Sequence, residues 1–369
     1  MRFAADENNT KITGRTIYRD GVRYLGYTGS SVSFRFKGKT AKVELVSDAS
    51  THEKRDYAWV AVFVKEEKDN EISYGAAADE EPYKRFCLDK DEAEYVLYES
   101  DEEKTVTVTL IKYSEAEYAA CGIKWIETDS EEILTPPAAK KLKIEMVGDS
   151  ITCGYGNEGG VEETQHDTSK ENPMGAYSLL TATHLDADVN VVAWNGKGVI
   201  TAYIGEDAPK VKDADWLVPM LYEYTDAGCE RDYLHTPEDK WEKWDNSNFI
   251  PDIITVYLGT NDASYTDNDA ARNEEFVNGY TKFLGTIRSK NSEIPILCML
   301  GTMDKRLCGS VERAVELFNS KNNTDNVYYL ELPFQDEADG LSINWHPTVK
   351  THRKTAEIVE KKIIEILKK

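Results

Sequence analysis

The sequence predicts two domains of different class: an all-β sandwich of the jelly-roll type over residues 1–136, and an α/β domain with a mainly parallel sheet covered by helices over residues 137–369. The first observation is the length, since 369 residues exceed what one hydrophobic core usually serves. The second is a change of pattern, from short apolar segments separated by turns to strands that alternate with helices. The third is a connector with Pro136 and Pro137 where the pattern changes.

Residues 1–136 have the pattern of many short β-strands. Apolar and β-branched segments recur there, and several alternate with the period of two that a half-buried strand requires. Turn signals separate the segments, among them 28–31 and Lys37-Gly38-Lys39. Regularly spaced short strands of this kind are typical of a sandwich. The expected strands cover residues 22–27, 32–36, 41–46, 58–64, 95–98, 105–111 and 118–126.

From residue 142 the pattern alternates between strands and helices. This alternation favours βαβ units and a parallel sheet with both faces covered. In the last expected helix Ala356, Val359 and Ile363 recur at helical spacing, which predicts that one face packs on the sheet. The expected strands are 142–147, 189–193, 253–258, 294–300 and 327–332, and the expected helices are about 175–186, 270–290, 309–321 and 348–367.

The segment 219–249 departs from this alternation. It combines many charges with aromatic residues that follow no clear period. A long aromatic insertion in an α/β domain is usually either functional or a packing element between domains, and the sequence leaves both interpretations open. The aromatic residues are Tyr222, Tyr224, Tyr233, Trp241, Trp244 and Phe249.

The chain is strongly acidic. Lys and Arg number 44 and Asp and Glu number 67, so the formal net charge is −23. This charge repels phosphate backbones and anionic lipid, and it therefore disfavours nucleic acid and membrane partners while it accommodates a neutral or cationic substrate.

The longest apolar runs, 253–258 and 294–300, fall far short of the roughly 20 residues that span a bilayer. The oligomeric state is not indicated.

The cysteines and the first residues predict a cytoplasmic location. The six cysteines are scattered without a C-x-x-C pair, so we expect free thiols rather than a zinc site or a disulfide framework. His166 and His184 have no partners at metal-ligand spacing, so no metal site is expected. The first eight residues turn acidic at once and contain no apolar core of a secretory signal.

The strongest chemical signal is Gly148-Asp149-Ser150, directly after the first expected parallel strand. Open α/β sheets bind ligands at the carboxyl ends of their strands. A serine in a glycine-flanked turn at this place can present its hydroxyl as a nucleophile. For Asp149 the expected role is local, as a cap for the N–H groups of the turn. An ordinary capped turn can have the same triplet, so residues elsewhere in the sequence must distinguish a nucleophilic serine from a structural one.

Three further loops at the sheet edge supply such residues. Gly196 and Gly198 follow the strand at 189–193, and Asn261 follows the strand at 253–258. His346, within Trp345-His346-Pro347, precedes the last helix. One serine, one glycine, one asparagine and one histidine thus arrive at one edge in chain order. This set resembles the SGNH (GDSL-type) hydrolase superfamily.

The resemblance implies a role for each residue. Ser150 would attack an ester carbonyl, and His346 would act as general base and then as acid for the leaving alcohol. The backbone N–H of Ser150, the N–H of Gly196 and the side chain of Asn261 would form the oxyanion hole, with Gly198 as the alternative glycine. The set is chemically coherent, because a hydroxyl needs an adjacent base and an oxyanion needs preorganised donors.

A β-sandwich ahead of such a domain, together with Trp345-His346-Pro347, narrows the resemblance to carbohydrate esterase family 2. These enzymes deacetylate plant polysaccharides such as xylan and mannan. The resemblance implies a jelly roll followed by an SGNH hydrolase, with neither metal nor cofactor. It also implies a cleft lined by aromatic residues that stack on sugars, a role that we expect for Trp345, Trp241 or Trp244.

The sequence departs from the superfamily pattern before the histidine. SGNH enzymes carry an Asp three residues ahead of it, and some relatives two residues ahead, but here these positions are Ile343 and Asn344. An Asp would fix the imidazole tautomer and stabilise the imidazolium. We expect a Ser–His dyad whose ring is oriented by a backbone carbonyl or by Asn344. The alternative is a triad completed by Asp339 or a more distant carboxylate.

The sequence therefore predicts a carbohydrate O-acetyl esterase that acts on acetylated oligosaccharides or polysaccharides. One alternative is a lipase or thioesterase of the same superfamily, which would need a continuous apolar groove rather than a charged aromatic one. Another is a non-catalytic glycan-binding protein with a decayed hydrolase domain, against which the four intact blocks argue. A cytoplasmic enzyme of this kind would act on imported oligosaccharides.

Overall fold

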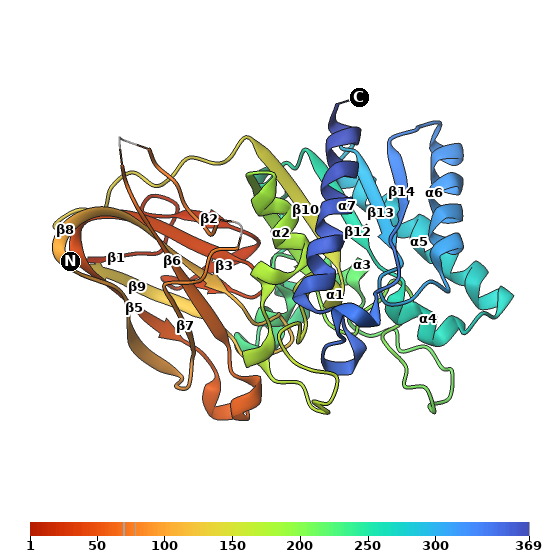
Figure 1. The fold of residues 1–369 in the computed structure, drawn as a ribbon, viewed down its shortest axis with the longest axis horizontal. Coiled ribbons are helices and arrows are strands. Elements are labelled where there is room, and N and C mark those ends of the chain that lie inside the picture. Colours follow the sequence, from red (N-terminus) through yellow and green to blue (C-terminus); the bar gives the residue numbers. More distant parts are fainter. Residues whose placement is uncertain (69–70, 78, 369) are drawn as a thin grey trace.

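The computed structural model describes residues 1–68, 71–77 and 79–368, which form an antiparallel β domain followed by an α/β domain (Figure 1). The last strand of the first sheet ends at Thr128, and the first strand of the second begins at Leu142. The prediction of an all-β domain ahead of an α/β domain is confirmed.

The first domain is one curled antiparallel sheet (Figure 1). Its main strand order is β3-β4-β9-β5-β8-β6-β7, while β1 pairs with β9 and β2 with β5. The apolar side chains of the long strands, Phe34 and Val108 among them, fill a core inside the curl. The strands are β1 (Arg2–Phe3), β2 (Lys11–Thr13), β3 (Thr16–Arg19), β4 (Val22–Leu25), β5 (Ser31–Val46), β6 (Trp59–Glu66), β7 (Lys84–Cys87), β8 (Glu92–Lys112) and β9 (Gly122–Thr128).

Two expected strand breaks in this domain are wrong. Strand β5 runs through Lys37-Gly38-Lys39, and β8 runs through the charged residues 99–104. The two strands pair along most of their length, with a register shift between Gly38 and Thr40. Gly38 pairs with Lys104 and Thr40 with Glu99, so Lys39 and residues 100–103 are skipped at an irregularity of the pairing. Glycine and charge signal a turn from sequence, but here both strands continue, and their pairing resumes beyond the skipped residues.

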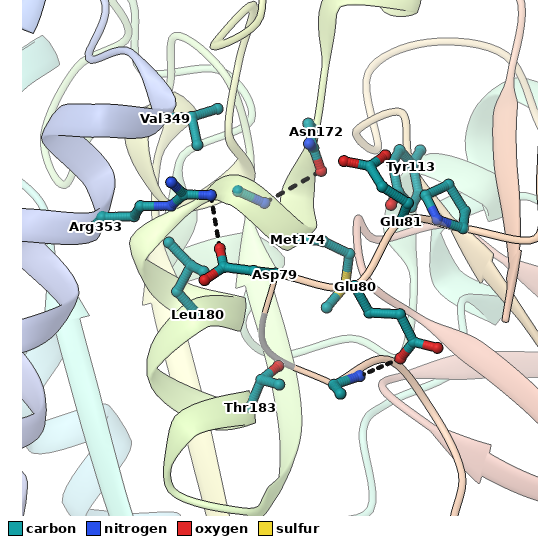
Figure 2. Close-up of a pocket in the computed structure, with 13 residues that line it drawn as sticks. Asp79, Glu80, Glu81, Tyr113, Asn172, Met174, Leu180, Thr183, Val349 and Arg353 are labelled. Carbon is teal, nitrogen blue, oxygen red and sulfur yellow. Dashed lines mark hydrogen bonds and ion pairs between the residues drawn. The ribbon is translucent and has the colours of Figure 1, made fainter. Parts of the chain in front are cut away.

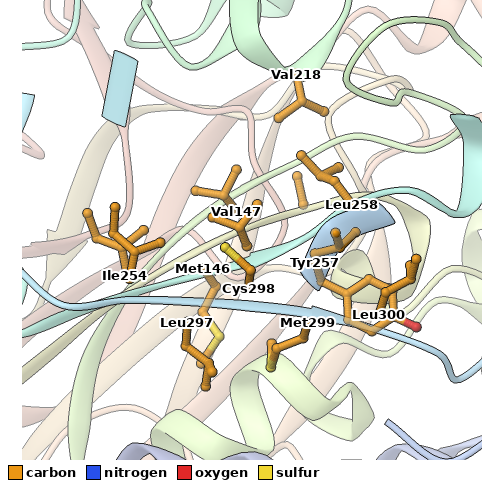
Figure 3. Close-up of a cluster of buried hydrophobic side chains, with 14 of the residues drawn as sticks. Met146, Val147, Val218, Ile254, Tyr257, Leu258, Leu297, Cys298, Met299 and Leu300 are labelled. Atoms are coloured by element: carbon orange, nitrogen blue, oxygen red, sulfur yellow. The ribbon is translucent and has the colours of Figure 1, made fainter. Parts of the chain in front are cut away.

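The second domain contains a fully parallel sheet in the order β11-β10-β12-β13-β14. Every residue of β11, β12 and β13 is buried, so both faces of the sheet are covered. Figure 3 shows Met146, Ile254 and Cys298 from three neighbouring strands in one apolar cluster. The strands are β10 (Leu142–Gly148), β11 (Ala187–Ala193), β12 (Ile253–Tyr257), β13 (Ile296–Leu300) and β14 (Val327–Glu331).

The four expected helices are present within two residues of the predicted bounds. Helix α2 packs beside α7, and α5 packs beside α6 (Figure 1). Val359 and Ile363 of α7 are buried, as the helical spacing predicts. The helices are α1 (Ser150–Cys153), α2 (Tyr177–His184), α3 (Val218–Leu221), α4 (Thr260–Thr266), α5 (Ala270–Lys290), α6 (Cys308–Asn322) and α7 (Val349–Leu367). None of the helices within the described ranges is long and apolar enough to cross a membrane.

The segment 219–249 packs against the first domain. The buried guanidinium of Arg15 donates to the carbonyls of Tyr222 and Tyr224 at 2.8 and 2.9 Å, and Arg19 forms a bidentate ion pair with Glu230. Tyr24 lies against Tyr233 with ring centroids 5.4 Å apart. Of the two interpretations that the sequence left open, these contacts favour packing between the domains.

Candidate active site

The loops at the carboxyl edge of the parallel sheet bring the predicted residues together. Ser150 follows β10 at the start of α1, and Gly196 follows β11. Asn261 follows β12 in the first turn of α4, and His346 precedes α7. Strand β10 lies between β11 and β12, which is where a doubly wound sheet opens a crevice for ligands. Ser150, Gly196, Asn261 and His346 all line one cavity there.

Ser150 and His346 form a hydrogen-bonded pair. The Ser150 Oγ lies 2.8 Å from the His346 Nε2, and the His346 Nδ1 lies 3.0 Å from the carbonyl oxygen of Ile343. A carbonyl only accepts hydrogen bonds, so Nδ1 carries the proton and Nε2 is the acceptor for the serine hydroxyl. This arrangement can activate a hydroxyl nucleophile.

The environment of His346 keeps the imidazole neutral. The side chain is buried, and burial lowers its pKa to about 4, while the hydrogen bond to Ile343 acts in the opposite direction. The ring of Tyr155 packs against it with centroids 4.5 Å apart. At neutral pH the ring is therefore uncharged and ready to accept a proton.

The carbonyl of Ile343 stands where a triad would place a carboxylate. Asp339 forms ion pairs with Lys350 and Lys354 instead. The side chain of Asn344 donates to the hydroxyl of Tyr155 at 3.0 Å. Among the alternatives left open by the sequence, the geometry is that of a dyad whose ring is oriented by the backbone.

The turn before His346 has an unusual backbone. Asn344 and Trp345 have φ values of 51° and 60°. These values lie in the left-handed region, which residues other than glycine and asparagine rarely adopt. Gln335 holds the turn by donating to the Trp345 carbonyl at 2.7 Å. This conformation brings the Ile343 carbonyl within hydrogen-bonding distance of the His346 Nδ1. It also leaves the Trp345 side chain exposed.

The two candidate glycines differ in their surroundings. Gly196 has a φ of 69° and lines the cavity, and a Cβ there would meet nothing within 4 Å. At Gly198 a Cβ would lie 2.4 Å from the carboxylate of Asp262, because the loop packs tightly on that side chain. Gly196 therefore faces the site, whereas Gly198 lets the loop approach Asp262.

Asn261 is oriented by the same loop. Its Nδ2 donates to the carbonyl of Lys197 at 3.0 Å, and its contact with Asp149 Oδ2 is long, at 3.5 Å. The long bond to Asp149 is the weaker of the two, so its N–H can be exchanged to a developing oxyanion. A carboxamide in this position is a preorganised hydrogen-bond donor.

Asp149 and Asp262 act on the backbone. Asp149 caps α1 by accepting from the Ile151 N–H at 3.1 Å, as expected. Asp262 accepts from the N–H groups of Val199, Ile200 and Thr201 and so holds the end of the glycine-containing loop. Burial raises the pKa of Asp149 to about 7 and that of Asp262 to about 6.

The cavity around the Ser–His pair has a volume of about 840 Å³. Three of its aromatic side chains are exposed in large part: Tyr203 at 55%, Phe334 at 57% and Trp345 at 63%. Exposed aromatic faces beside a polar pair are suited to stacking on a sugar ring. Charged residues, Asp304 and Arg306 among them, complete the wall.

Trp241 and Trp244 do not line this cavity, so the expectation that they would bind substrate there is corrected. Trp241 is buried among Trp194, Trp216 and Tyr224, and its indole N–H donates to the Thr236 carbonyl. The ring of Trp244 lies against the guanidinium of Arg15. Both tryptophans serve the packing of the 219–249 segment. Of the three tryptophans expected to bind substrate, only Trp345 lines the cavity.

A second pocket lies between the domains and shares no lining residue with the first. Figure 2 shows its rim, where Arg353 of α7 pairs with Asp79. Met174 and Leu180 contribute apolar walls. The volume of about 70 Å³ is too small for a sugar unit, so this pocket is a gap in the domain interface.

Glu115, His166 and Glu171 are residues whose ligand atoms could meet at one cation, since these atoms lie within 4.8 Å of one another. The carboxylate of Glu171 already accepts from His166 and from the backbone N–H of Glu115, both at 2.9 Å. Glu115 accepts from the Asn195 N–H at 2.8 Å. A cation would have to replace these bonds, so the donor set fits a hydrogen-bonded cluster better than a metal site.

Comparison with known protein families shows which family this chain belongs to. Residues 146–354, more than half of the chain, match the model of the GDSL-like lipase/acylhydrolase family. The chain belongs to this family. Ahead of this match, residues 12–137 match the model of the carbohydrate esterase 2 N-terminal domain. The predicted resemblance is thus confirmed over both domains.

Several proteins named as esterases are similar to this GDSL-family chain along most of its length. The cellulase/esterase CelE of Acetivibrio thermocellus is 28% identical over 362 residues, which are 95% of this chain but 39% of that protein. An acetylxylan esterase/glucomannan deacetylase of Cellvibrio japonicus is 25% identical and covers 99% of this chain and 91% of its own. A family two carbohydrate esterase from Clostridium thermocellum, solved with cellohexaose, superposes with a TM-score of 0.79 at 27% identity, covering 97% and 99% of the two chains.

Sequence reasoning missed several parts of this site. Tyr155 lies five residues after Ser150, yet only the fold brings its ring to His346. The exposure of Tyr203 and Phe334 at the cavity depends on loops without a periodic pattern. The contact of Glu115 with Asn195 joins residues 80 positions apart. No local signal marks such pairs.

Proposed function

We propose that this protein is a carbohydrate O-acetyl esterase that removes acetyl groups from plant polysaccharides or oligosaccharides. The observation that carries the proposal is the 2.8 Å hydrogen bond from the Ser150 hydroxyl to the His346 Nε2 inside an open cavity with exposed aromatic walls. Family membership supports ester hydrolysis, and the relatives named as acetylxylan esterase/glucomannan deacetylase and carbohydrate esterase support an acetylated glycan as substrate.

The chemistry proceeds by acyl transfer through the serine. Ser150 Oγ attacks the acetyl carbonyl while His346 Nε2 takes the hydroxyl proton, and the carbonyl of Ile343 stabilises the resulting imidazolium through Nδ1–H. The oxyanion receives hydrogen bonds from the N–H groups of Ser150 and Gly196 and from the amide of Asn261.

Collapse of this intermediate breaks the bond to the sugar oxygen. His346 returns its proton to that oxygen, which leaves as the alcohol, and the acetyl group stays on Ser150. Water then attacks the acetyl-enzyme with His346 again as base. Acetate is released, and Ser150 regains its proton.

The cavity favours a sugar over a long acyl chain. Trp345, Phe334 and Tyr203 offer exposed aromatic faces, while Glu206, Asp304, Arg306 and Glu337 place charges along the wall. A lipase or thioesterase would need a continuous apolar groove, and burying an alkyl chain beside these charges would desolvate them. The intact hydrogen-bonded pair argues against a purely binding role.

A cytoplasmic location stays a prediction from sequence. Cys87, Cys121, Cys153, Cys229, Cys298 and Cys308 are all unpaired, which fits a reducing compartment.

The decisive experiment is NMR-monitored deacetylation of acetylated xylan and mannan oligosaccharides by the full chain. We expect release of acetate, with the position of the lost acetyl read from the sugar resonances, and no release by the Ser150→Ala variant. Hydrolysis of long acyl esters without any reaction on acetylated sugars would replace the proposal with the lipase function. Binding of the oligosaccharides without hydrolysis of any ester would replace it with a glycan-binding function.

A further inference from the structure

The segment 115–118 of the first domain reaches the glycine-containing loop of the catalytic domain. The carboxyl group of Glu115 accepts from the backbone N–H of Asn195 at 2.8 Å, and Glu117 accepts from the Asn195 side chain at 3.2 Å. Asn195 is the residue immediately before Gly196. Both of its hydrogen-bonding contacts therefore come from a different domain.

Glu115 is itself held rigidly. It is fully buried, and its backbone N–H donates to Glu171 at 2.9 Å. Its backbone carbonyl accepts from the buried ammonium of Lys112 at 2.8 Å, and the same ammonium binds the carbonyls of Gly26 and Ser114. The backbone of Glu115 is therefore held on both sides, and this fixes the position from which its buried carboxyl group binds the loop.

The loop is thus anchored at both ends. Asp262 of the catalytic domain binds three consecutive N–H groups from Val199 onward, while Glu115 and Glu117 bind Asn195. Gly196 lies between the two anchors with open space where a Cβ would be. A glycine in such a loop has little conformational restraint of its own, so the anchors determine where its N–H points.

We infer that Glu115 and Glu117 are positioning residues for the oxyanion hole, so that the β domain completes the catalytic site by holding Asn195 and thereby the N–H of Gly196. The inference rests on the proposed esterase function. Its physical basis is that an oxyanion donor lowers the barrier only when it is already aimed at the developing charge. Neither glutamate needs to touch the substrate.

The segment 115–118 is also connected to His346, through a stack of aromatic rings. Tyr118 stacks on His166 with centroids 4.5 Å apart, His166 stacks on Tyr155 at 4.3 Å, and Tyr155 packs on His346 at 4.5 Å. Residues 115–118 therefore contact both the glycine loop and the aromatic stack that ends at the catalytic base.

The test compares variants of the full chain by steady-state kinetics on 4-nitrophenyl acetate. Glu117 is exposed, so Glu117→Ala should fold, and we expect it to lower kcat by about tenfold with KM unchanged, since an interaction made in the transition state is weakened. Asn195→Ala should have the same effect, and the double variant should be no worse than either single one. Glu131→Ala, an exposed change in the same domain, is the control.

Glu115 allows a rescue experiment. Burial raises the pKa of this carboxyl well above its usual range, so Glu115→Gln is a neutral replacement that keeps an acceptor for the Asn195 N–H. We expect Glu115→Gln to retain kcat within about threefold and Glu115→Ala to lose about 10². If Glu115→Ala does not fold, the exposed Glu117 variant and the Glu115→Gln variant keep the test open.

Hydrogen–deuterium exchange separates this inference from the proposed function. We expect faster exchange of the 195–198 backbone in Glu117→Ala and not in Glu131→Ala. Wild-type kcat in Glu117→Ala and Glu115→Ala overturns the inference, and so does a strictly additive effect of Glu117→Ala and Asn195→Ala. A wild-type protein that exchanges as expected but hydrolyses no ester overturns the proposed function alone.

Discussion

The imidazole of His346 donates through Nδ1 to the backbone carbonyl of Ile343, three residues earlier in the chain, at 3.0 Å. A carbonyl carries a partial rather than a full negative charge, so it orients the ring but attracts the imidazolium less strongly than a carboxylate. The left-handed conformations of Asn344 and Trp345 make this contact possible.

Replacement of Asp339 tests the dyad. We expect Asp339→Ala to leave kcat for 4-nitrophenyl acetate within about twofold, because the Asp339 carboxylate pairs with Lys350 and Lys354, whereas the His346 Nδ1 bonds to the carbonyl of Ile343. A loss on the order of 10⁴, as for the carboxylate of a true triad, would show that Asp339 acts on His346. Circular dichroism would establish that the variant is folded.

Tyr155 separates ring packing from hydrogen bonding. Tyr155→Phe removes the acceptor of Asn344 but keeps the ring against His346, so kcat should fall by only about threefold. Tyr155→Ala removes both contacts, and a misplaced base should lower kcat by about 10². Equal rates for the two variants would mean that ring packing does not position His346. Steady-state kinetics on one ester substrate measures both.

Asn261 tests the oxyanion hole directly. Asn261→Ala should lower kcat by about 10²–10³, the usual effect of removing one preorganised donor, while KM changes little. Asn261→Asp supplies a matched control of similar size that cannot donate and should be at least as slow. An unchanged rate in the alanine variant would remove Asn261 from the site.

The pH profile should reflect the buried base. The reaction needs neutral His346, and burial lowers its pKa to about 4. Activity should therefore fall only as pH decreases through about 4, rather than near the 6.5 of an exposed histidine. The measurement is kcat/KM for a neutral acetyl ester between pH 3.5 and 8, with the fold monitored at each pH. An acid limb near 6.5 would contradict the buried, neutral base.

The same shift affects stability with a defined sign. Because the pKa of His346 is lower in the folded state, the unfolded chain binds more protons between about pH 4 and 6.5. The contribution of this group to the free energy of unfolding is therefore present above pH 6.5 and decreases as pH falls toward 4.

Trp345 tests the sugar-binding wall. Trp345→Ala should raise KM for an acetylated oligosaccharide by about tenfold, because stacking on an exposed ring is lost. The same variant should hydrolyse 4-nitrophenyl acetate normally, since that substrate needs no sugar platform. Tyr83→Ala, another exposed aromatic outside the cavity, is the control. A comparable fall of kcat on both substrates would assign Trp345 to the geometry of His346 instead.

Features that depend on neighbouring residues were predictable. Helix α5 spans Ala270–Lys290, the range expected from the alternation of strands and helices, and Asp149 caps the turn at Ser150 as its type indicates. The continuation of β5 through Gly38 is not predictable in this way, because it depends on pairing with β8 on both sides of the glycine, which local composition does not reveal.

The sequence by itself determined the fold class, the order of the domains and the four residue types that meet at the sheet edge, since the carboxyl ends of parallel strands necessarily converge. Only the tertiary structure decided the partner of His346, the choice of Gly196 over Gly198, and the placement of Trp241 and Trp244 away from the cavity. Each of these depends on the distances and directions of groups far apart in the chain. Such geometry arises from packing, so the residue pattern alone does not contain it.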